Sequence, residues 1–121
     1  MKNILFYSPD LNLLNNLLMY FNDRYSVTTT TNLSALSKFI ASREFDMLII
    51  DAEPNERVEK ICREIKNSDD PIPVLLTYVF TNQLKTADKN IRCLIEAVFY
   101  KPFDLKEVTD KIGAILSPVK L

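Results

Sequence analysis

Histidine is absent from the 121 residues of this sequence, and glycine occurs once, at Gly113. Without histidine, the chain can hold neither a histidine-based catalytic triad, nor a histidine metal site, nor a phosphohistidine of its own. The single glycine also excludes the phosphate loops of Rossmann and P-loop nucleotide-binding proteins, which depend on several glycines close together. The absences therefore remove several common classes of enzyme and nucleotide-binding protein.

Cysteine is scarce, and neither sign of charge is in excess. Cys62 and Cys93 lack CxxC spacing and fall in helical patterns. We therefore expect both to be reduced thiols that pack inside a cytoplasmic protein, although the sequence does not exclude a disulfide between them. The 15 basic and 16 acidic residues give no reason to expect nucleic acid or an anionic membrane as a partner. No apolar run is long enough to cross a bilayer, and residues 1–5 lack the longer apolar stretch of a signal peptide.

Short apolar or β-branched runs alternate with stretches of helical periodicity along the chain. The runs predict five strands, at residues 4–7, 26–30, 45–51, 74–76 and 98–101. Helical spacing of apolar residues follows each run, over residues 14–21, 36–40, 58–65, 84–94 and 105–116. The expected helix caps are Asp10, either Asn32 or Ser34, and Asp104 with Glu107.

Five strand–helix units in tandem predict an α/β fold with a parallel sheet between two layers of helices. Each crossover between parallel strands is right-handed, so helices must cover both faces. No repeat, linker or low-complexity segment divides the sequence. We therefore expect one domain over residues 1–121, with a short tail at residues 117–121.

Two of the predicted strands end in charged residues, Asp51 and Lys101. The carboxyl ends of parallel strands lie at one edge of a sheet, where ligands bind in open α/β folds. A carboxylate and an ammonium at that edge would form a site. The plainer alternatives are that Asp51 only starts a turn and that Lys101 is a solvated charge. Pro102, directly after Lys101, predicts a fixed turn, in which the peptide bond between Lys101 and Pro102 can be either cis or trans.

The strand ends at Asp51 and Lys101, together with a third motif, resemble those of a response-regulator receiver domain. The resemblance extends over almost the whole chain. The motifs are residues 45–51, residues 73–77 (Pro-Val-Leu-Leu-Thr) and residues 100–105 (Tyr-Lys-Pro-Phe-Asp-Leu). The resemblance implies a non-enzymatic, flavodoxin-like (βα)5 fold with strand order 2-1-3-4-5. It also implies that Asp51 accepts a phosphoryl group from a histidine kinase or phosphotransfer protein. Thr77 would contact that group, and Lys101 would supply the cation beside it.

The metal-binding part of the family pattern is altered. Receivers place two adjacent acidic residues after the first strand to hold Mg²⁺, and the corresponding positions here are Ser8 and Pro9. Asp10 and Glu53 are the nearest substitutes to help Asp51 hold the metal. Because a pair of carboxylates supplies much of the charge that attracts Mg²⁺, we expect its binding to be weak or lost.

Three further departures lie around the site. Pro54 comes one residue early in the loop after the third strand, which would displace a metal-binding carbonyl. Tyr78 follows the threonine where the family has a small residue, and we expect it to crowd the pocket. Val98 stands where receivers have a switch aromatic, so Phe99 or Tyr100 could replace it only with a changed orientation.

Two functions follow from these matches and departures. The first is a stand-alone receiver in a phosphorelay, and the alternative is a pseudo-receiver, an interaction module that works without phosphorylation. A flavin carrier is disfavoured because the first turn, residues 8–12, lacks residues suited to wrapping a phosphate.

The resemblance to receiver domains also implies a binding face, formed by the fourth helix, the fifth strand and the fifth helix. We expect this face, residues 81–96 and 104–116, to bind a protein partner or a second copy.

Overall fold

The computed structural model describes residues 1–116, in which five strands alternate with five α-helices. The strands are β1 (Asn3–Tyr7), β2 (Ser26–Thr30), β3 (Met47–Asp51), β4 (Val74–Tyr78) and β5 (Ala97–Tyr100). The helices are α1 (Leu11–Phe21), α2 (Leu36–Ala41), α3 (Glu56–Lys66), α4 (Lys85–Ile91) and α5 (Leu105–Leu116). Short 3-10 turns, η1 (Leu33–Ala35) and η2 (Asn82–Leu84), lead into α2 and α4. The predicted tail, residues 117–121, lies outside the described residues.

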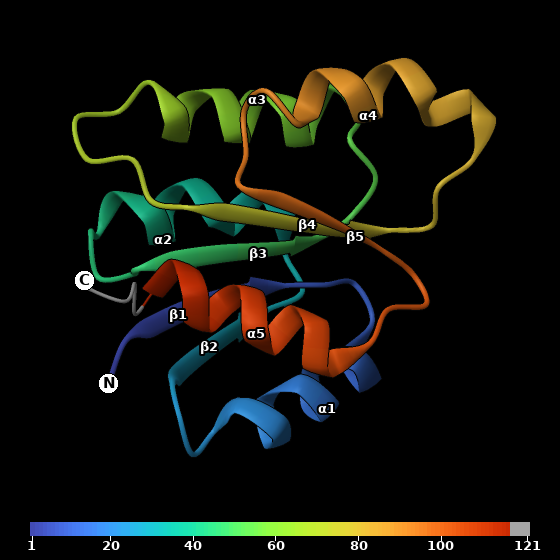
Figure 1. Cartoon of the computed structure of the whole chain (residues 1–121). Helices are drawn as coiled ribbons and strands as arrows, with labels where there is room; N and C mark the ends of the chain where they lie inside the picture. The colour runs from blue at the N-terminus through green and yellow to red at the C-terminus, as the bar shows by residue number, and fades with distance from the viewer. Residues whose placement is uncertain (117–121) are drawn as a thin grey trace, which may run out of the picture.

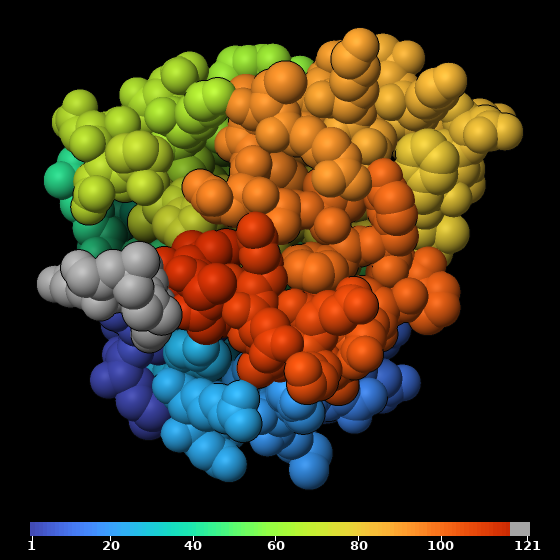
Figure 2. All heavy atoms as spheres, in the orientation of Figure 1, coloured from blue at the N-terminus to red at the C-terminus, as the bar shows by residue number. Residues whose placement is uncertain are grey.

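The strands form one parallel sheet in the order β2-β1-β3-β4-β5. Helices α1 and α5 lie on one side of this sheet, and α2, α3 and α4 lie on the other (Figure 1). The predicted flavodoxin-like sandwich with strand order 2-1-3-4-5 is therefore confirmed. In the space-filling view, α5 lies between α1 and the segment that runs from α4 to β5 (Figure 2).

The central strands build a separate core on each face of the sheet. Ile4, Phe6 and Ile49 pack with α1 and α5, whereas Leu5 and Ile50 pack with α2, α3 and α4. Both cores are apolar because the sheet is covered on both faces, which is why the strands read as continuous apolar runs rather than alternating ones. This alternation also fixes the face to which each residue near the end of a strand points.

The largest differences from the predicted elements lie around α4. Strand β4 continues past the predicted residues 74–76 to Tyr78, and α4 is shorter than the predicted 84–94. Leu84 belongs to the preceding 3-10 turn, and Leu94 lies beyond the helix end. Leu84 and Leu94 still pack against the same core, and a turn outside the helix fulfils that role as well as a helical position does. Apolar spacing alone therefore overestimated the helix.

Three predicted caps are present at the starts of their elements. Asp10, Asn32 and Asp104 accept backbone N–H groups of the first turns of α1, η1 and α5. Asn32, and not Ser34, is the cap of its turn. Between residues 1 and 116, no helix combines the length and the apolar character that crossing a membrane requires.

The two cysteines are free thiols in different environments. Cys62 is buried, and this burial, with a smaller contribution from the charge of Glu59, raises its thiol pKa to about 12. Cys93 is exposed, so the expectation that both cysteines are packing residues was wrong for Cys93. The reason is the early end of α4, which places Cys93 in a surface turn.

Candidate functional site

Four side chains meet at the carboxyl edge of the sheet, on the face covered by α1 and α5. Asp51 ends β3, and Thr77 lies beside it in β4. Ser8 and Lys101 each lie one residue beyond their strands, β1 and β5. Each of the four comes two residues after a strand side chain that packs against α1 and α5. Strand alternation therefore directs all four to one place, at the edge where open α/β sheets bind ligands.

Asp51 is the centre of this cluster. Its side chain is almost fully buried, and three donors contact its carboxylate. Thr77 Oγ1 donates to Oδ1 at 3.0 Å, and Lys101 Nζ contacts the same oxygen at 2.9 Å. Ser8 Oγ donates to Oδ2 at 2.6 Å. Such full pairing explains how a carboxylate is tolerated inside the protein.

Lys101 reaches Asp51 from the solvent side of the site. Its side chain is 32% exposed, against 6% for that of Asp51, so Lys101 is the more solvent-accessible member of the pair. The backbone N–H of Lys101 donates to the carbonyl of Tyr78 at 2.9 Å, which continues the pairing of β5 with β4. The bond from Lys101 to Pro102 is cis, in agreement with the fixed turn predicted there. The predicted convergence of Asp51 and Lys101, 50 residues apart, is confirmed.

Ser8 is the contact that the sequence did not predict. It was considered only as a residue that supplies no carboxylate to a metal. In the structure it is fully buried, and its hydroxyl donates to Asp51 and accepts from the backbone N–H of Asp10 at 2.9 Å. The signal that could have identified it is its position, two residues after Phe6 on the same face of β1.

Few carboxylates among the described residues are free to hold a resident Mg²⁺ ion. Mg²⁺ prefers oxygen ligands, usually including one or two carboxylates with free charge. Here Asp51 is paired with Lys101, and the side chain of Asp10 caps α1. Glu53 is exposed, and no three Asp, Glu or Cys side chains within residues 1–116 lie close enough together to hold a metal ion. The metal-binding roles of Asp51, Asp10 and Glu53 stay predictions.

A second polar network lies on the opposite face of the sheet, between β4, α4 and β5. Its centre is Asp88, which accepts hydrogen bonds from the hydroxyls of Tyr78 and Tyr100. Arg92 Nε donates to the other carboxylate oxygen at 2.9 Å, and Arg92 Nη2 donates to the Tyr100 hydroxyl at 2.9 Å. The prediction that Tyr78 crowds the Asp51 pocket was wrong, because Thr77 and Tyr78 point to opposite faces of the sheet.

The network shifts the ionisation of its members. Burial disfavours the charged form of Asp88, but hydrogen bonds from Tyr78, Tyr100 and Arg92 outweigh it and hold the pKa of this carboxyl below its usual value. Burial, together with the hydrogen bond to Asp88, raises the pKa of Tyr78 well above that of a free phenol. Hydrogen bonding to Asp88 raises the pKa of Arg92. The stable state is therefore an anionic Asp88 carboxylate with a neutral Tyr78 phenol and a cationic Arg92 guanidinium.

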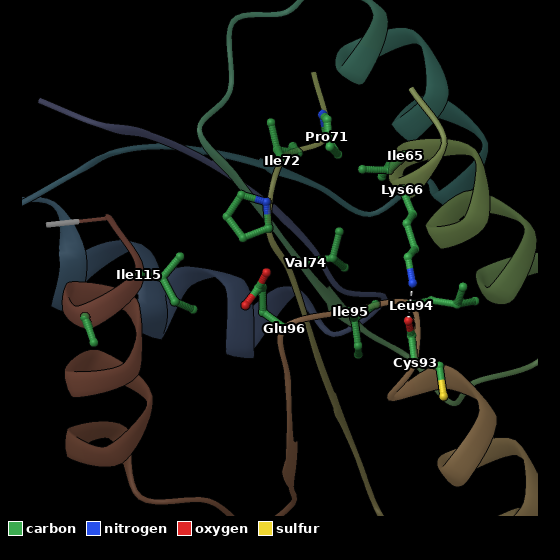
Figure 3. Close-up of a pocket in the computed structure, with 12 residues that line it drawn as sticks. Ile65, Lys66, Pro71, Ile72, Val74, Cys93, Leu94, Ile95, Glu96 and Ile115 are labelled. Carbon is green, nitrogen blue, oxygen red and sulfur yellow. Dashed lines mark hydrogen bonds between the residues drawn. The ribbon is translucent and has the colours of Figure 1, made fainter. Parts of the chain in front are cut away.

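A cavity of about 710 Å³ lies at the other edge of the sheet, away from Asp51. Its walls come from the end of α3, the segments that lead into β4 and β5, and the last part of α5, and they are mostly apolar (Figure 3). Lys66 Nζ donates to the carbonyl of Cys93 at its margin, and Glu96 is exposed. Both charged residues among the described residues that line it, Lys66 and Glu96, are exposed, and we assign the cavity no ligand.

Comparisons with known proteins agree with the fold. No protein-family model matches the chain, and no curated protein matches it. A receiver domain of a signal transduction histidine kinase from Syntrophus aciditrophicus is 20% identical, with 99% of this chain and 93% of that chain covered and a TM-score of 0.83. A two-component response regulator from Clostridium difficile is 18% identical, with 98% of each chain covered and a TM-score of 0.78.

A third similar structure has a different description. It is a candidate pilus assembly protein from Burkholderia thailandensis, 21% identical, with 97% of this chain and 99% of that chain covered and a TM-score of 0.77. At these identities the likeness shows the fold alone. The chain has the fold of a response-regulator receiver domain.

Proposed function

We propose that this chain is a cytoplasmic, stand-alone signalling domain that accepts a phosphoryl group on Asp51 and passes the signal on through protein contacts. The observation that supports this most is the convergence of Lys101 and Thr77 on one carboxylate oxygen of Asp51. The donor would be the phosphohistidine of a histidine kinase or phosphotransfer protein. Such a domain carries the signal and catalyses no reaction on a separate substrate.

The proposed step is an in-line displacement at phosphorus. A carboxylate oxygen of Asp51 forms the new bond to phosphorus while the bond from phosphorus to the donor imidazole nitrogen breaks. The electron pair of that bond returns to the imidazole, which takes up a proton. Oδ2 of Asp51 is the better nucleophile, because only Ser8 donates to it, whereas Oδ1 is held by both Thr77 and Lys101.

The residues around Asp51 would stabilise the charge that arrives with the phosphoryl group. Lys101 lies nearer to solvent than Asp51, so its ammonium can move onto the phosphoryl oxygens without leaving the site. The hydroxyls of Thr77 and Ser8 can turn from Asp51 to donate to the same oxygens. With one cation and two hydroxyls around Asp51 in the described part of the chain, and few carboxylates there to hold a metal ion, we expect slow transfer.

The signal would leave through the face of α4, β5 and α5. Phe80 and Tyr100 lie on this side, and both are partly exposed, with ring centroids 5.1 Å apart. Tyr100 also contacts Arg92, which lies 5.5 Å from its ring centroid. An exposed aromatic pair next to a guanidinium is typical of the composition of protein interfaces. We propose that a downstream protein binds here.

A second candidate function is an interaction module that works without phosphorylation. The hydrogen bond from Ser8 to Asp51 favours this function. Ser8 stands where receiver domains have a metal-binding acid, and its neutral hydroxyl donates to the second oxygen of the Asp51 carboxylate, so that both oxygens have donors. In that case Asp51 and Lys101 would serve only to hold the ends of β3 and β5 together.

Incubation with acetyl phosphate, with and without Mg²⁺, separates the two candidates by intact-protein mass. If Asp51 is the acceptor, the wild-type protein gains one phosphoryl group, which hydroxylamine then removes because it is an acyl phosphate. Asp51→Asn should gain none, whereas Glu53→Gln, a neutralised carboxylate two residues away, should gain as much as wild type. An unmodified wild-type protein, or equal modification of Asp51→Asn, would reject Asp51 as the acceptor and favour the interaction module.

A further inference from the structure

Helix α1 carries no charge along its whole length. Its residues, Leu11–Phe21, read LNLLNNLLMYF, although charged residues make up 26% of the chain. Every other α-helix in the described part of the chain, residues 1–116, contains at least one lysine, arginine or carboxylate. A solvent-facing helix is normally charged on its outer side, so this composition marks α1 as different.

The outer side of α1 is also apolar at both ends. Leu11 is 61% exposed, Met19 79% and Tyr20 44%. Three asparagines on this side, Asn12, Asn15 and Asn16, are also exposed. The helix lies beside α5 at the rim of the molecule (Figure 2). The centres of protein interfaces are poor in Lys, Glu and Asp, and this surface carries Met19 and Tyr20 and no charged residue.

We infer that the outer side of α1 binds the outer side of α1 in a second copy of this chain, with the two helices antiparallel about a two-fold axis. This arrangement brings Leu11 of each copy opposite Met19 of the other. It also brings Asn15, which lies between Leu11 and Met19 in the same row of the helix, against Asn15 of the other copy at the axis. The inference is independent of the proposed phosphorylation of Asp51.

The asparagines are what favour a second copy over another partner. A side-chain amide both donates and accepts hydrogen bonds, so it can pair with the same group related by a two-fold axis. A lysine or carboxylate at the same place would meet its own charge across the axis. A charged partner, in turn, would find no opposite charge on α1. The surface therefore fits a second copy of itself, as a buried asparagine does in paired helices.

The contact is expected to be weak. An 11-residue helix is about 16 Å long, and one such face buries less area than the interfaces of stable dimers do. We therefore expect a dissociation constant well above the micromolar values of standard-size interfaces. The dimer should form in concentrated solution or where copies are held close together, and it leaves the face of α4, β5 and α5 free.

Opposite charges placed at the axis test this arrangement. In sedimentation velocity, wild-type protein should shift from monomer towards dimer as its concentration rises to about 1 mM. Asn15→Asp and Asn15→Lys should each weaken association at least tenfold, because like charges then meet. An equimolar mixture of the two variants should associate at least as tightly as wild type, because the two charges are then opposite. Asn15 is exposed, and circular dichroism would verify that both variants are folded.

Asn90→Asp is the matched control, an exposed asparagine changed in the same way on α4. It should leave association unchanged. A wild-type protein that stays monomeric throughout the concentration range would overturn the inference. So would Asn15 variants that associate like wild type, or a mixture that associates no better than either variant alone. Loss of association in Asn90→Asp alone would assign the contact to α4 instead and equally reject α1.

Discussion

Replacing Ser8 with aspartate is expected to destabilise the protein strongly in metal-free buffer and to make its stability depend on Mg²⁺. The Ser8 hydroxyl is fully buried, 2.6 Å from Oδ2 of Asp51. A carboxylate at residue 8 would face Asp51 in a buried site that holds one cation, Lys101. The expected loss is about 3 kcal/mol, since a second buried carboxylate lacks a partner. Mg²⁺ would supply that partner and restore stability.

Thermal unfolding with and without MgCl₂ measures this effect. The melting temperature of Ser8→Asp should lie roughly 10 °C below that of wild type without metal and rise on addition of Mg²⁺. Ser8→Asn is the matched control, since it is nearly isosteric with aspartate and uncharged, and it should show no response to Mg²⁺. If wild type is itself stabilised by Mg²⁺ as much as Ser8→Asp, the wild-type residues do hold the metal and our assessment of the site is wrong.

Replacing Asp88 with alanine is expected to cost about 3 kcal/mol of unfolding free energy at neutral pH. The carboxylate is buried and accepts hydrogen bonds from Tyr78, Tyr100 and Arg92. Its removal leaves the buried Tyr78 hydroxyl without an acceptor and the guanidinium without its partner. Urea unfolding measures the difference. Asp110→Ala, which removes an exposed carboxylate paired with Lys106, should change stability by less than about 0.5 kcal/mol.

The contribution of Asp88 should also depend on pH in a defined direction. Its pKa is lower in the folded protein than in the unfolded chain. The stabilisation is therefore fully present above the unfolded pKa, about 3.9, and is lost as the pH falls through the lower, folded value. The gap in unfolding free energy between wild type and Asp88→Asn should narrow as the pH is lowered from about 5 to about 2. A constant gap across this range would show that the charge of Asp88 does not contribute.

This network also bears on how the proposed signal could reach a partner. Thr77, which contacts Asp51, and Tyr78, which contacts Asp88, are neighbours in β4 and face opposite sides of the sheet. A shift of Thr77 towards a phosphoryl group would therefore act on the residue that connects β4 to α4. Asp88 also connects α4 to Tyr100 of β5. We expect movement of this part of the molecule to require loosening of the Asp88 contacts.

Local patterns in the sequence were enough to predict the α/β fold class and the pair of charged residues at the carboxyl edge of the sheet. Apolar runs too short for helices, each followed by helical spacing, leave few arrangements other than a covered parallel sheet. In such a sheet Asp51 and Lys101 must come to the same edge, because each ends a parallel strand. These conclusions needed only local periodicity and chain direction. The same reasoning predicted the caps at Asp10 and Asp104, which depend on residues two or three positions away.

The contacts between polar groups of different elements could not be predicted from the sequence and became known from the folded structure. The bond from Ser8 to Asp51 joins residues 43 positions apart, and the contacts of Asp88 join β4, α4 and β5. Local spacing carries no information on contacts between residues so far apart in the sequence. For this reason Ser8 was interpreted as a lost metal ligand and Tyr78 as a residue that crowds the Asp51 pocket. The end of α4 was also beyond local patterns, because Leu94 packs into the core from a turn. A buried polar side chain is positioned by the partner that compensates for its lost hydration, and that partner is known only once the chain has folded.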